Sequence, residues 1–168
     1  HYFCPIMIKV HIRKATKSDA RSILFLIREL AIFEKEPESV ILTEDQIERD
    51  GFGDRPLFEC FVAEVAGQVV GMALFYPRYS TWKGPTFHLE DLIVTESMKG
   101  KGIGTQLYIA FLKYANEAGV ERIEWAVLDW NLPAINFYQK SGADVLDYWK
   151  TVQMDKQSIE NYISKINL

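Results

Sequence analysis

The sequence predicts a mixed α/β (α+β) fold, a single domain in which helices flank a central sheet of about six to seven strands. Strand-like and helix-like segments follow one another in the order β-αα-βββ-α-β-α-β. The chain has 168 residues, which is enough to bury one sizeable core. Its 48% hydrophobic and 25% charged residues are the balance of a globular protein.

The N-terminal part contains one expected strand and two expected helices. Residues 7–13 alternate apolar and polar side chains, as a half-buried strand does. A capping box at residues 16–19 opens a helix whose apolar face carries Ile23, Ile27 and Leu30. A second box at residues 43–46 opens a short helix that Gly51 can end.

Three further strands and a helix are expected in the middle of the chain. Residues 58–65 and 69–76 flank a two-residue turn and predict a hairpin. The apolar run at residues 87–94 predicts the next strand. The helical pattern of residues 103–118 is closed by Gly119.

The C-terminal part continues the alternation of strands and helices. Residues 123–128 predict a strand, and Pro133 lies where a first-turn proline belongs in a helix that ends at Gly142. Residues 145–154 predict one or two final strands, and residues 157–165 a last helix.

Domain organisation is expected to be simple. No internal repeat, low-complexity run or long linker marks a boundary, so residues 7–168 predict one domain. Met7 is a plausible natural start, and residues 1–6 are interpreted as a vector or disordered remnant. These first residues lack the basic start and apolar core of a signal peptide.

Composition excludes several classes of protein. No apolar run approaches the length of a membrane span. A net charge of −4 argues against a nucleic-acid partner and favours cationic ligands. Cys4 and Cys60 make no disulfide framework, which predicts a reducing cytoplasm. The three histidines form no cluster with metal-ligand spacing, so no catalytic metal is expected.

The loop between the third strand of the middle part and the helix after it carries the clearest functional signal. Its sequence is Lys99-Gly100-Lys101-Gly102-Ile103-Gly104-Thr105. Three alternate glycines let the backbone approach a ligand closely, and two lysines add positive charge. The helix start leaves unpaired N–H groups and a positive dipole end. The pattern predicts a diphosphate cradle, with a glycine-rich turn that binds nothing as the alternative.

Two common diphosphate motifs do not fit the spacing. A dinucleotide fingerprint would need its third glycine at Thr105. A P-loop would need Lys-Ser or Lys-Thr after Gly104, where the chain has Thr105-Gln106. The remaining spacing is basic-x-x-Gly-x-Gly between a strand and a helix.

Two adjacent carboxylates interrupt the apolar strand that precedes this loop. Glu90 and Asp91 point to opposite faces of a regular strand, so at least one points inward unless a bulge re-aims it. A carboxylate that points into the apolar interior is costly unless it has a partner or a functional role. The alternative is a solvated acidic rim at the end of the sheet.

Together these elements resemble a known family. The glycine loop, the strand before it and the helix that contains Asn136-Phe137-Tyr138 are similar to the acetyl-CoA site of the GNAT superfamily of N-acetyltransferases. The resemblance extends from about residue 12 to residue 156. It is tightest to the diamine (spermidine/spermine) acetyltransferase branch, and especially to its thialysine N-ε-acetyltransferase members. The stretches that carry it are residues 27–31, 33–35, 50–54, 80–84, 89–91 and 127–131.

The resemblance implies a GNAT fold and a set of site residues. Glu90 would be the general base and Tyr138 the acid that protonates the departing thiolate. The amine pocket would be lined by Phe33, Glu34, Glu90, Asp91 and Asp129. Acetyl-CoA would be held by Leu92, Ile93, Val94, Lys99, Gly100, Lys101, Gly102, Ile103, Gly104, Thr105, Asn131, Ala134 and Tyr138. The family usually has arginine or glutamine where this chain has Lys99, which keeps the charge but loses the planar fork of arginine.

The expected function is acetyl transfer from acetyl-CoA to the primary amine of a small cationic substrate, similar to thialysine or lysine. A spermidine, spermine or other diamine acetyltransferase is the alternative within enzymes, and a CoA-binding module without turnover is the alternative outside them. The resemblance also implies a homodimer, for which Tyr148, Trp149 and Val152 are candidate interface residues. No nucleic acid, membrane or metal is expected to take part.

Overall fold

The computed structural model describes residues 8–166. The expected remnant at residues 1–6 and the expected start at Met7 lie outside the described residues. The chain forms two compact units, one up to Ala126 and one from Val127 on, and each is described by itself. None of the helices between residues 8 and 166 is long and apolar enough to cross a membrane.

The first unit is built on a five-stranded sheet with the order β1-β2-β3-β4-β5. β1 to β4 pair antiparallel, and β5 joins β4 in parallel. The strands are β1 (His11–Lys14), β2 (Glu59–Val65), β3 (Gln68–Ser80), β4 (Gly84–Val94) and β5 (Ile123–Glu124).

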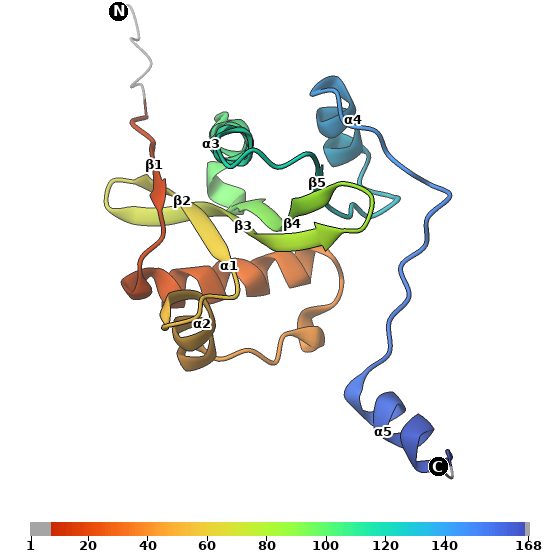
Figure 1. The fold of residues 1–168 in the computed structure, drawn as a ribbon. Helices are drawn as coiled ribbons and strands as arrows, with labels where there is room; N and C mark the ends of the chain where they lie inside the picture. The colour runs from red at the N-terminus through yellow and green to blue at the C-terminus, as the bar shows by residue number, and fades with distance from the viewer. Residues whose placement is uncertain (1–7, 167–168) are drawn as a thin grey trace, which may run out of the picture. The chain divides into compact units, whose positions relative to one another are not determined.

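Helices cover both faces of this sheet. α1 (Ala20–Phe33) and α2 (Glu44–Phe52) lie on one face, and α3 (Ile103–Glu117) lies on the other (Figure 1). The apolar residues separate into two cores accordingly. One core joins α1 and α2 to the sheet through Ile23, Leu26, Ile47, Val62, Met72, Leu74 and Ile93. The other joins α3 to the sheet through Phe75, Phe87, Leu89, Val94, Leu107 and Phe111.

The predicted number of six to seven strands is wrong for the described residues, which contain five. The strand expected at residues 123–128 is limited to β5. Residues 145–154 form no strand at all, because no neighbouring segment pairs with their backbone groups and most of their apolar side chains are exposed. A hydrophobic pattern predicts a strand, whereas a strand exists only where a ladder forms.

The second unit contains two helices, α4 (Leu132–Lys140) and α5 (Lys156–Ser164), close to their expected bounds. Pro133 occupies the first turn of α4, as predicted, and Gly142 follows its end with a φ of 96°. Asp155 caps α5 by accepting a hydrogen bond from the Ser158 N–H at 2.7 Å.

Both predicted capping boxes form in the first unit. The Thr43 N–H donates to Gln46 Oε1 at 2.9 Å, and the Gln46 N–H donates back to Thr43 Oγ1 at 3.3 Å. At the other box the Thr16 N–H donates to Asp19 Oδ2 at 2.7 Å, and a short 3₁₀ turn, η1 (Lys17–Asp19), leads into α1. α2 runs one residue past the expected end at Gly51.

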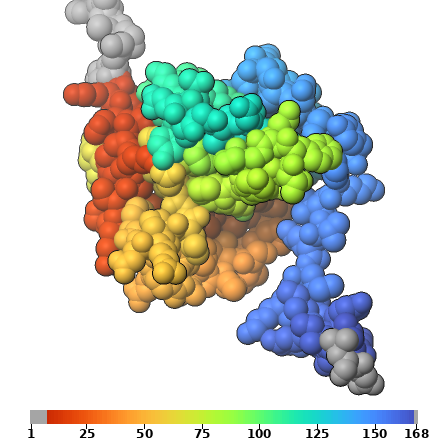
Figure 2. Space-filling view, viewed as in Figure 1, coloured from red at the N-terminus to blue at the C-terminus, as the bar shows by residue number. Residues whose placement is uncertain are grey.

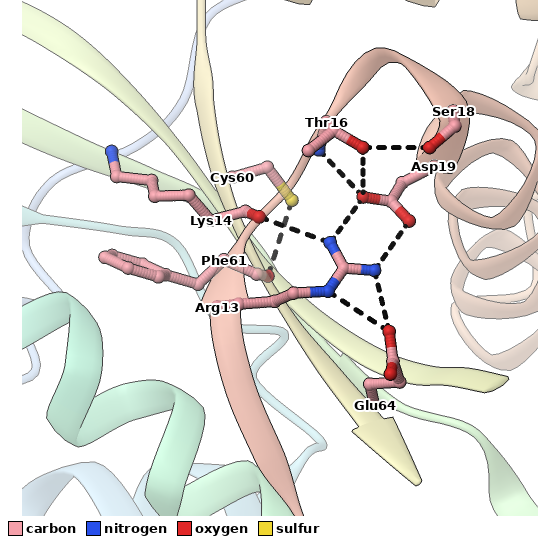
Figure 3. Close-up of polar contacts among 8 residues, drawn as sticks. All are labelled: Arg13, Lys14, Thr16, Ser18, Asp19, Cys60, Phe61 and Glu64. Carbon is pink, nitrogen blue, oxygen red and sulfur yellow. Dashed lines mark hydrogen bonds and ion pairs between the residues drawn. The ribbon is translucent and has the colours of Figure 1, made fainter. Parts of the chain in front are cut away.

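An ionic network fastens the first strand to its neighbours. The Arg13 guanidinium on β1 donates to both carboxylate oxygens of Asp19, at 2.7 and 2.9 Å, and to Glu64 Oε2 on β2, at 2.9 and 3.1 Å (Figure 3). The hydrogen bond from Arg13 lowers the pKa of the buried Asp19 carboxyl below its usual range. This planar, two-sided pairing ties β1, β2 and the start of α1 together.

The β2–β3 turn offers a stabilising substitution. Ala66 and Gly67 both have positive φ, at 49° and 77°, which is the type I′ geometry of a two-residue hairpin. Alanine is disfavoured there, whereas asparagine tolerates the left-handed region. We expect Ala66→Asn to raise the free energy of unfolding by about 0.5–1 kcal/mol in chemical denaturation. Ala66→Ser is the control and should leave it nearly unchanged; an equal gain for both variants would contradict the turn argument.

Candidate active site

A β-bulge places the two adjacent acids of β4 on the same side of the sheet. In the β3–β4 ladder Leu74 lies opposite Asp91 and Phe75 lies opposite Leu89, so Glu90 is left without a partner in the register. Leu89 is buried on the α3 side, which directs Glu90 to the α1 side. Asp91 also faces the α1 side, where it borders a pocket lined by helix residues. The bulge therefore aims both carboxylates toward α1.

An open pocket of about 190 Å³ lies beside these acids, between α1, the 3₁₀ turn η2 (Pro37–Ser39) and the edge of β4. Its lining combines apolar side chains with three carboxylates: Ile27, Leu30, Ala31, Glu34, Glu36, Ser39, Val40 and Asp91. A larger hollow of about 530 Å³ lies at the end of α2, where Arg49 and Asp50 pair with each other at 2.8 Å. The smaller pocket is the better candidate, because its carboxylates are not neutralised in this way.

Three carboxyl groups influence one another at this pocket. Burial, with Glu90 and Glu34 nearby, raises the pKa of Asp91 to about 7. Partial burial and the charge of Glu90 also raise the pKa of Glu34. Like charges collected in a partly dry site favour a cationic ligand, which relieves their repulsion.

The raised pKa of Asp91 predicts opposite effects on binding and stability. Its carboxylate forms as pH rises through about 7, so the KM of a cationic substrate should fall over that range. The folded state binds more protons here than the unfolded state, so ionisation of Asp91 lowers stability from about pH 4 upward. We expect Asp91→Asn to weaken substrate binding at pH 8 and to raise the free energy of unfolding there by about 1–3 kcal/mol.

Amine kinetics and denaturation at pH 5, 6, 7 and 8 check both effects. Glu38→Gln, which removes an exposed carboxylate of η2, is the control. An Asp91→Asn variant that is less stable than the parent at pH 8 would contradict the assigned pKa shift.

Glu90 is held by two aromatic side chains on the same face. The Tyr76 hydroxyl on β3 donates to Glu90 Oε2 at 3.0 Å, and His88 Nε2 lies 3.5 Å from the same oxygen. The Tyr76 and His88 rings stack with their centres 5.2 Å apart. Burial and the bond to Glu90 raise the pKa of Tyr76 to about 12, so this phenol stays a donor. The carboxylate therefore keeps a fixed orientation.

The predicted glycine loop has the geometry of an anion cradle. Gly100 and Gly102 have positive φ, at 74° and 76°, and a Cβ on either would meet no heavy atom within 4 Å. α3 starts at Ile103, and its first hydrogen bond to the loop runs from the Gln106 N–H to the Gly102 carbonyl at 3.1 Å. The N–H groups of the first turn before Gln106 have no partner within the helix, and they fit a diphosphate.

Helix α1 anchors the chain between β4 and this cradle. Glu29 accepts hydrogen bonds from Thr95 Oγ1, at 2.9 and 3.0 Å, and from the Glu96 N–H, at 2.9 Å. Thr95 and Glu96 open the 3₁₀ turn η3 (Glu96–Met98). Lys99 pairs with Glu96 at 2.7 Å and lies 5.0 Å from the centre of the Phe33 ring. The loop is thereby fastened to both the middle and the end of α1.

The structure brings most of the first-unit candidates together around β4. Phe33 and Glu34 lie at the end of α1, Glu90 and Asp91 lie in the bulge, and Leu92, Ile93 and Val94 complete the strand that leads to the cradle. Lys101 and Thr105 are exposed on the cradle loop and the first turn of α3. Cys60, expected as a core residue, is buried in β2.

Four candidates belong to the second unit and are described within it. Asp129 is exposed on the turn before α4. Asn131 caps α4, and its Oδ1 accepts a hydrogen bond from the Ala134 N–H at 3.4 Å. Tyr138 lies in the middle of α4, with its ring 5.5 Å from that of Phe137. The substrate role of Asp129, the cofactor roles of Asn131, Ala134 and Tyr138, and the acid role of Tyr138 remain predictions.

Three contact residues were not among the sequence-based candidates: Tyr76, Glu29 and Arg78. Tyr76 contacts Glu90, Glu29 contacts Thr95 before the cradle, and Arg78 contacts His88. Their place follows from strand register and helix packing, which no local pattern reveals. Among residues 8–166, no group of three or more His, Cys, Asp or Glu side chains is arranged to hold a metal ion.

A match to a protein-family model shows which family the chain belongs to. The model described as "Acetyltransferase (GNAT) family" matches residues 23–143, which include most of α1, the bulged strand, the cradle and α4. The chain belongs to the GNAT acetyltransferase family. It is accordingly an acyltransferase, and its mixed sheet flanked by helices is the GNAT fold.

Relatives of known name agree with this assignment. The chain is 40% identical to the thialysine N-ε-acetyltransferase of Mus musculus over 83% of this chain and 87% of that protein. It is 38% identical to the spermidine/spermine N(1)-acetyltransferase-like protein 1 of Homo sapiens over 79% of this chain, but only 20% of that longer protein. A solved aminoglycoside N-acetyltransferase in complex with CoA is 18% identical, with a TM-score of 0.70 over 92% of this chain and 99% of that one. The last likeness shows the fold alone.

Proposed function

We propose that this enzyme transfers an acetyl group from acetyl-CoA directly to the primary amine of a small cationic substrate similar to thialysine or lysine. The observation that carries the proposal is the bulge that aims Glu90 and Asp91 toward Glu34 at an open pocket. The names of the thialysine and spermidine/spermine relatives support an amine acceptor. A polyamine or another diamine is the alternative substrate, and CoA binding without turnover is the alternative function.

The cradle fits the diphosphate of acetyl-CoA. The free N–H groups at the start of α3 would donate to phosphate oxygens, and the positive end of the helix dipole favours their charge. Lys101 adds a cation, while Lys99 is shared with Glu96. When bound, acetyl-CoA supplies an activated thioester. Backbone groups of Leu92 to Val94 are proposed to align it and to polarise its carbonyl.

Glu90 is proposed to take the proton from the substrate ammonium. An alkylamine with a pKa near 10.4 is nucleophilic in only about one molecule in a thousand at neutral pH, which costs roughly 4 kcal/mol. A carboxylate oriented by Tyr76 and His88 can bind the cation and accept its proton through water. No protein side chain needs to carry the acetyl group.

Tyr138 is proposed to protonate the departing thiolate. We expect Tyr138→Phe to lower kcat about 10²-fold or more and to leave acetyl-CoA affinity within about threefold, since phenylalanine keeps the ring and loses the acid. Steady-state kinetics and calorimetry with the cofactor check the two parts. Phe137→Leu on the same helix is the packing control. Unchanged turnover would remove Tyr138 from the acid role, and lost cofactor binding would make its role structural.

Two further expectations stand as proposals. A homodimer is proposed, and the apolar side chains of Tyr148, Trp149 and Val152, which are exposed in the second unit, are candidates for its interface. A stable monomer in sedimentation at micromolar concentration would contradict the dimer. A cytoplasmic location, with no nucleic-acid or membrane partner, is proposed from cysteine usage and charge.

The test of the function is CoA-thiol release from acetyl-CoA across a panel of amines. The panel contains thialysine, lysine, spermidine, spermine, putrescine and a lysine-bearing peptide. Release with one small amine would support the transferase and identify its substrate class. Binding of acetyl-CoA without release for any amine would favour the CoA-binding module.

A further inference from the structure

We propose that Arg78 forms a carboxylate-binding subsite, which selects an amino acid with a side-chain amine over a polyamine. The inference rests on the proposed acetyl transfer at Glu90 and extends it to the other end of the substrate. The face of the β3–β4 hairpin that carries Glu90 continues away from the bulge toward Arg78. The end of this hairpin is at the surface, between the α3 layer and the α1 layer of the first unit (Figure 2).

Strand register sets the order of groups on this face. Tyr76 lies opposite His88, and Arg78 is two residues further along β3 on the same face. Arg78 Nη1 lies 3.5 Å from His88 Nδ1, and His88 Nε2 lies 3.5 Å from Glu90 Oε2. One imidazole ring thus separates the guanidinium from the carboxylate, which places them within about 10 Å of each other.

The three groups in this row carry different charges. A guanidinium can only donate, so Nδ1 of His88 acts as the acceptor and its Nε2–H points to Glu90. Burial lowers the pKa of His88, although Glu90 opposes the shift, and the ring stays neutral at pH 7. The face therefore presents a negative charge at Glu90, a neutral spacer at His88 and a positive charge at Arg78.

This order matches a substrate with an ammonium at one end and a carboxylate at the other. Lysine has four methylene groups between its Cα and its side-chain amine, and in thialysine a sulfur atom replaces one of them. When the side chain is extended, the side-chain ammonium and the α-carboxylate lie about 6–8 Å apart. When the side-chain amine of the substrate lies at Glu90, its α-carboxylate can reach the guanidinium of Arg78. A guanidinium can donate two parallel hydrogen bonds to the two oxygens of a carboxylate. Next to the α-ammonium of the amino acid, this carboxylate offers Arg78 an anionic partner. A polyamine would bring a second cation to Arg78 with no carboxylate to pair with the guanidinium, and it would be repelled there.

Arg78 is available for such a contact. Its side chain is 52% exposed, and its contact with Glu124 Oε2 on β5 is long, at 3.4 Å. Glu124 also contacts Arg122 at 3.4 Å, so it keeps a cationic partner when Arg78 turns to a ligand. The subsite can therefore form without leaving a charge unpaired.

The test compares each amine with its counterpart that lacks the carboxylate. Lysine and cadaverine are assayed as acceptors with the enzyme, its Arg78→Met variant and its Lys83→Met variant. Lys83, in the β3–β4 turn, is the matched control for loss of one exposed cation from the same hairpin. Loss of a charge-assisted hydrogen bond should raise the KM for lysine about 10- to 100-fold in Arg78→Met, with kcat within about threefold. The KM for cadaverine should stay the same or fall, and Lys83→Met should change neither.

A second variant removes Glu124, the carboxylate that would compete with the substrate for Arg78. Glu124→Gln removes the carboxylate that contacts Arg78, so the KM for lysine should fall while that for cadaverine stays the same. Equal changes for lysine and cadaverine in Arg78→Met, or none, would overturn the subsite and leave the proposed function standing. Acetylation of cadaverine but not lysine by the parent enzyme would do the same. Acetylation of no amine would overturn both.

Discussion

Gly102→Val is expected to abolish acetyl-CoA binding. Gly102 precedes α3 with a φ of 76°, where a β-branched residue is strained, and its Cβ would project into open space. The substitution should displace the N–H groups at the start of α3 and block the approach of the diphosphate. We expect the Kd of acetyl-CoA, measured by calorimetry, to rise at least about 10³-fold, consistent with loss of several charge-assisted hydrogen bonds.

Gly119→Val provides a matched control at the other end of the same helix. Gly119 has a φ of 71°, and its Cβ would also meet no heavy atom within 4 Å, so the backbone strain is similar. Both variants should lose a similar amount of stability, about 1–2 kcal/mol or somewhat more. Only Gly102→Val should lose acetyl-CoA. Normal affinity in Gly102→Val would mean that the diphosphate lies elsewhere.

Glu90→Gln is expected to lower kcat/KM for lysine by about 10²- to 10⁴-fold, the range for loss of a general base. Glutamine keeps the size of the side chain and one carbonyl acceptor for the Tyr76 hydroxyl, but it cannot take a proton. Acetyl-CoA affinity should stay near that of the parent enzyme, since Glu90 lies outside the cradle.

Substrates of different basicity show whether Glu90 accepts a proton or only contacts the cation. The thioether of thialysine lowers the pKa of its amine, so thialysine depends less on the base than lysine does. Glu90→Gln should therefore reduce kcat/KM for lysine more than that for thialysine. Equal losses for the two amines would contradict the proton-acceptor role and leave Glu90 as a contact for the cation.

Local signals predicted much of the first unit. Capping boxes at Thr16 and Thr43 have side-chain partners three residues away, so the sequence alone locates the helix starts. The backbone of the cradle could also be predicted from local sequence. Glycine at positions 100 and 102 indicates a positive φ before a helix, and both residues have a positive φ in the structure. For residues that no local pattern could assign, such as Tyr138 and Asn131, the predicted roles came from the family resemblance.

The bulge and the contacts around it were not predictable in this way. The sequence showed two adjacent acids in β4, but only the register with β3 shows that Glu90 is skipped and that both acids face α1. Tyr76 and Arg78 reach Glu90 and His88 across strands, and a register shift of one residue would separate them. The strands expected at residues 145–154 failed for the same reason, since pairing depends on a partner that lies far away in sequence.

A competition between two acceptors in one reaction tests the proposed acetyl transfer most directly. Equal concentrations of thialysine and spermidine are incubated with acetyl-CoA and a catalytic amount of protein, and the products are identified by mass spectrometry. We predict that acetylated thialysine, modified on its side-chain amine, forms first and in many turnovers per protein molecule. Acetylation of spermidine alone, or binding of acetyl-CoA with neither amine acetylated, would contradict it.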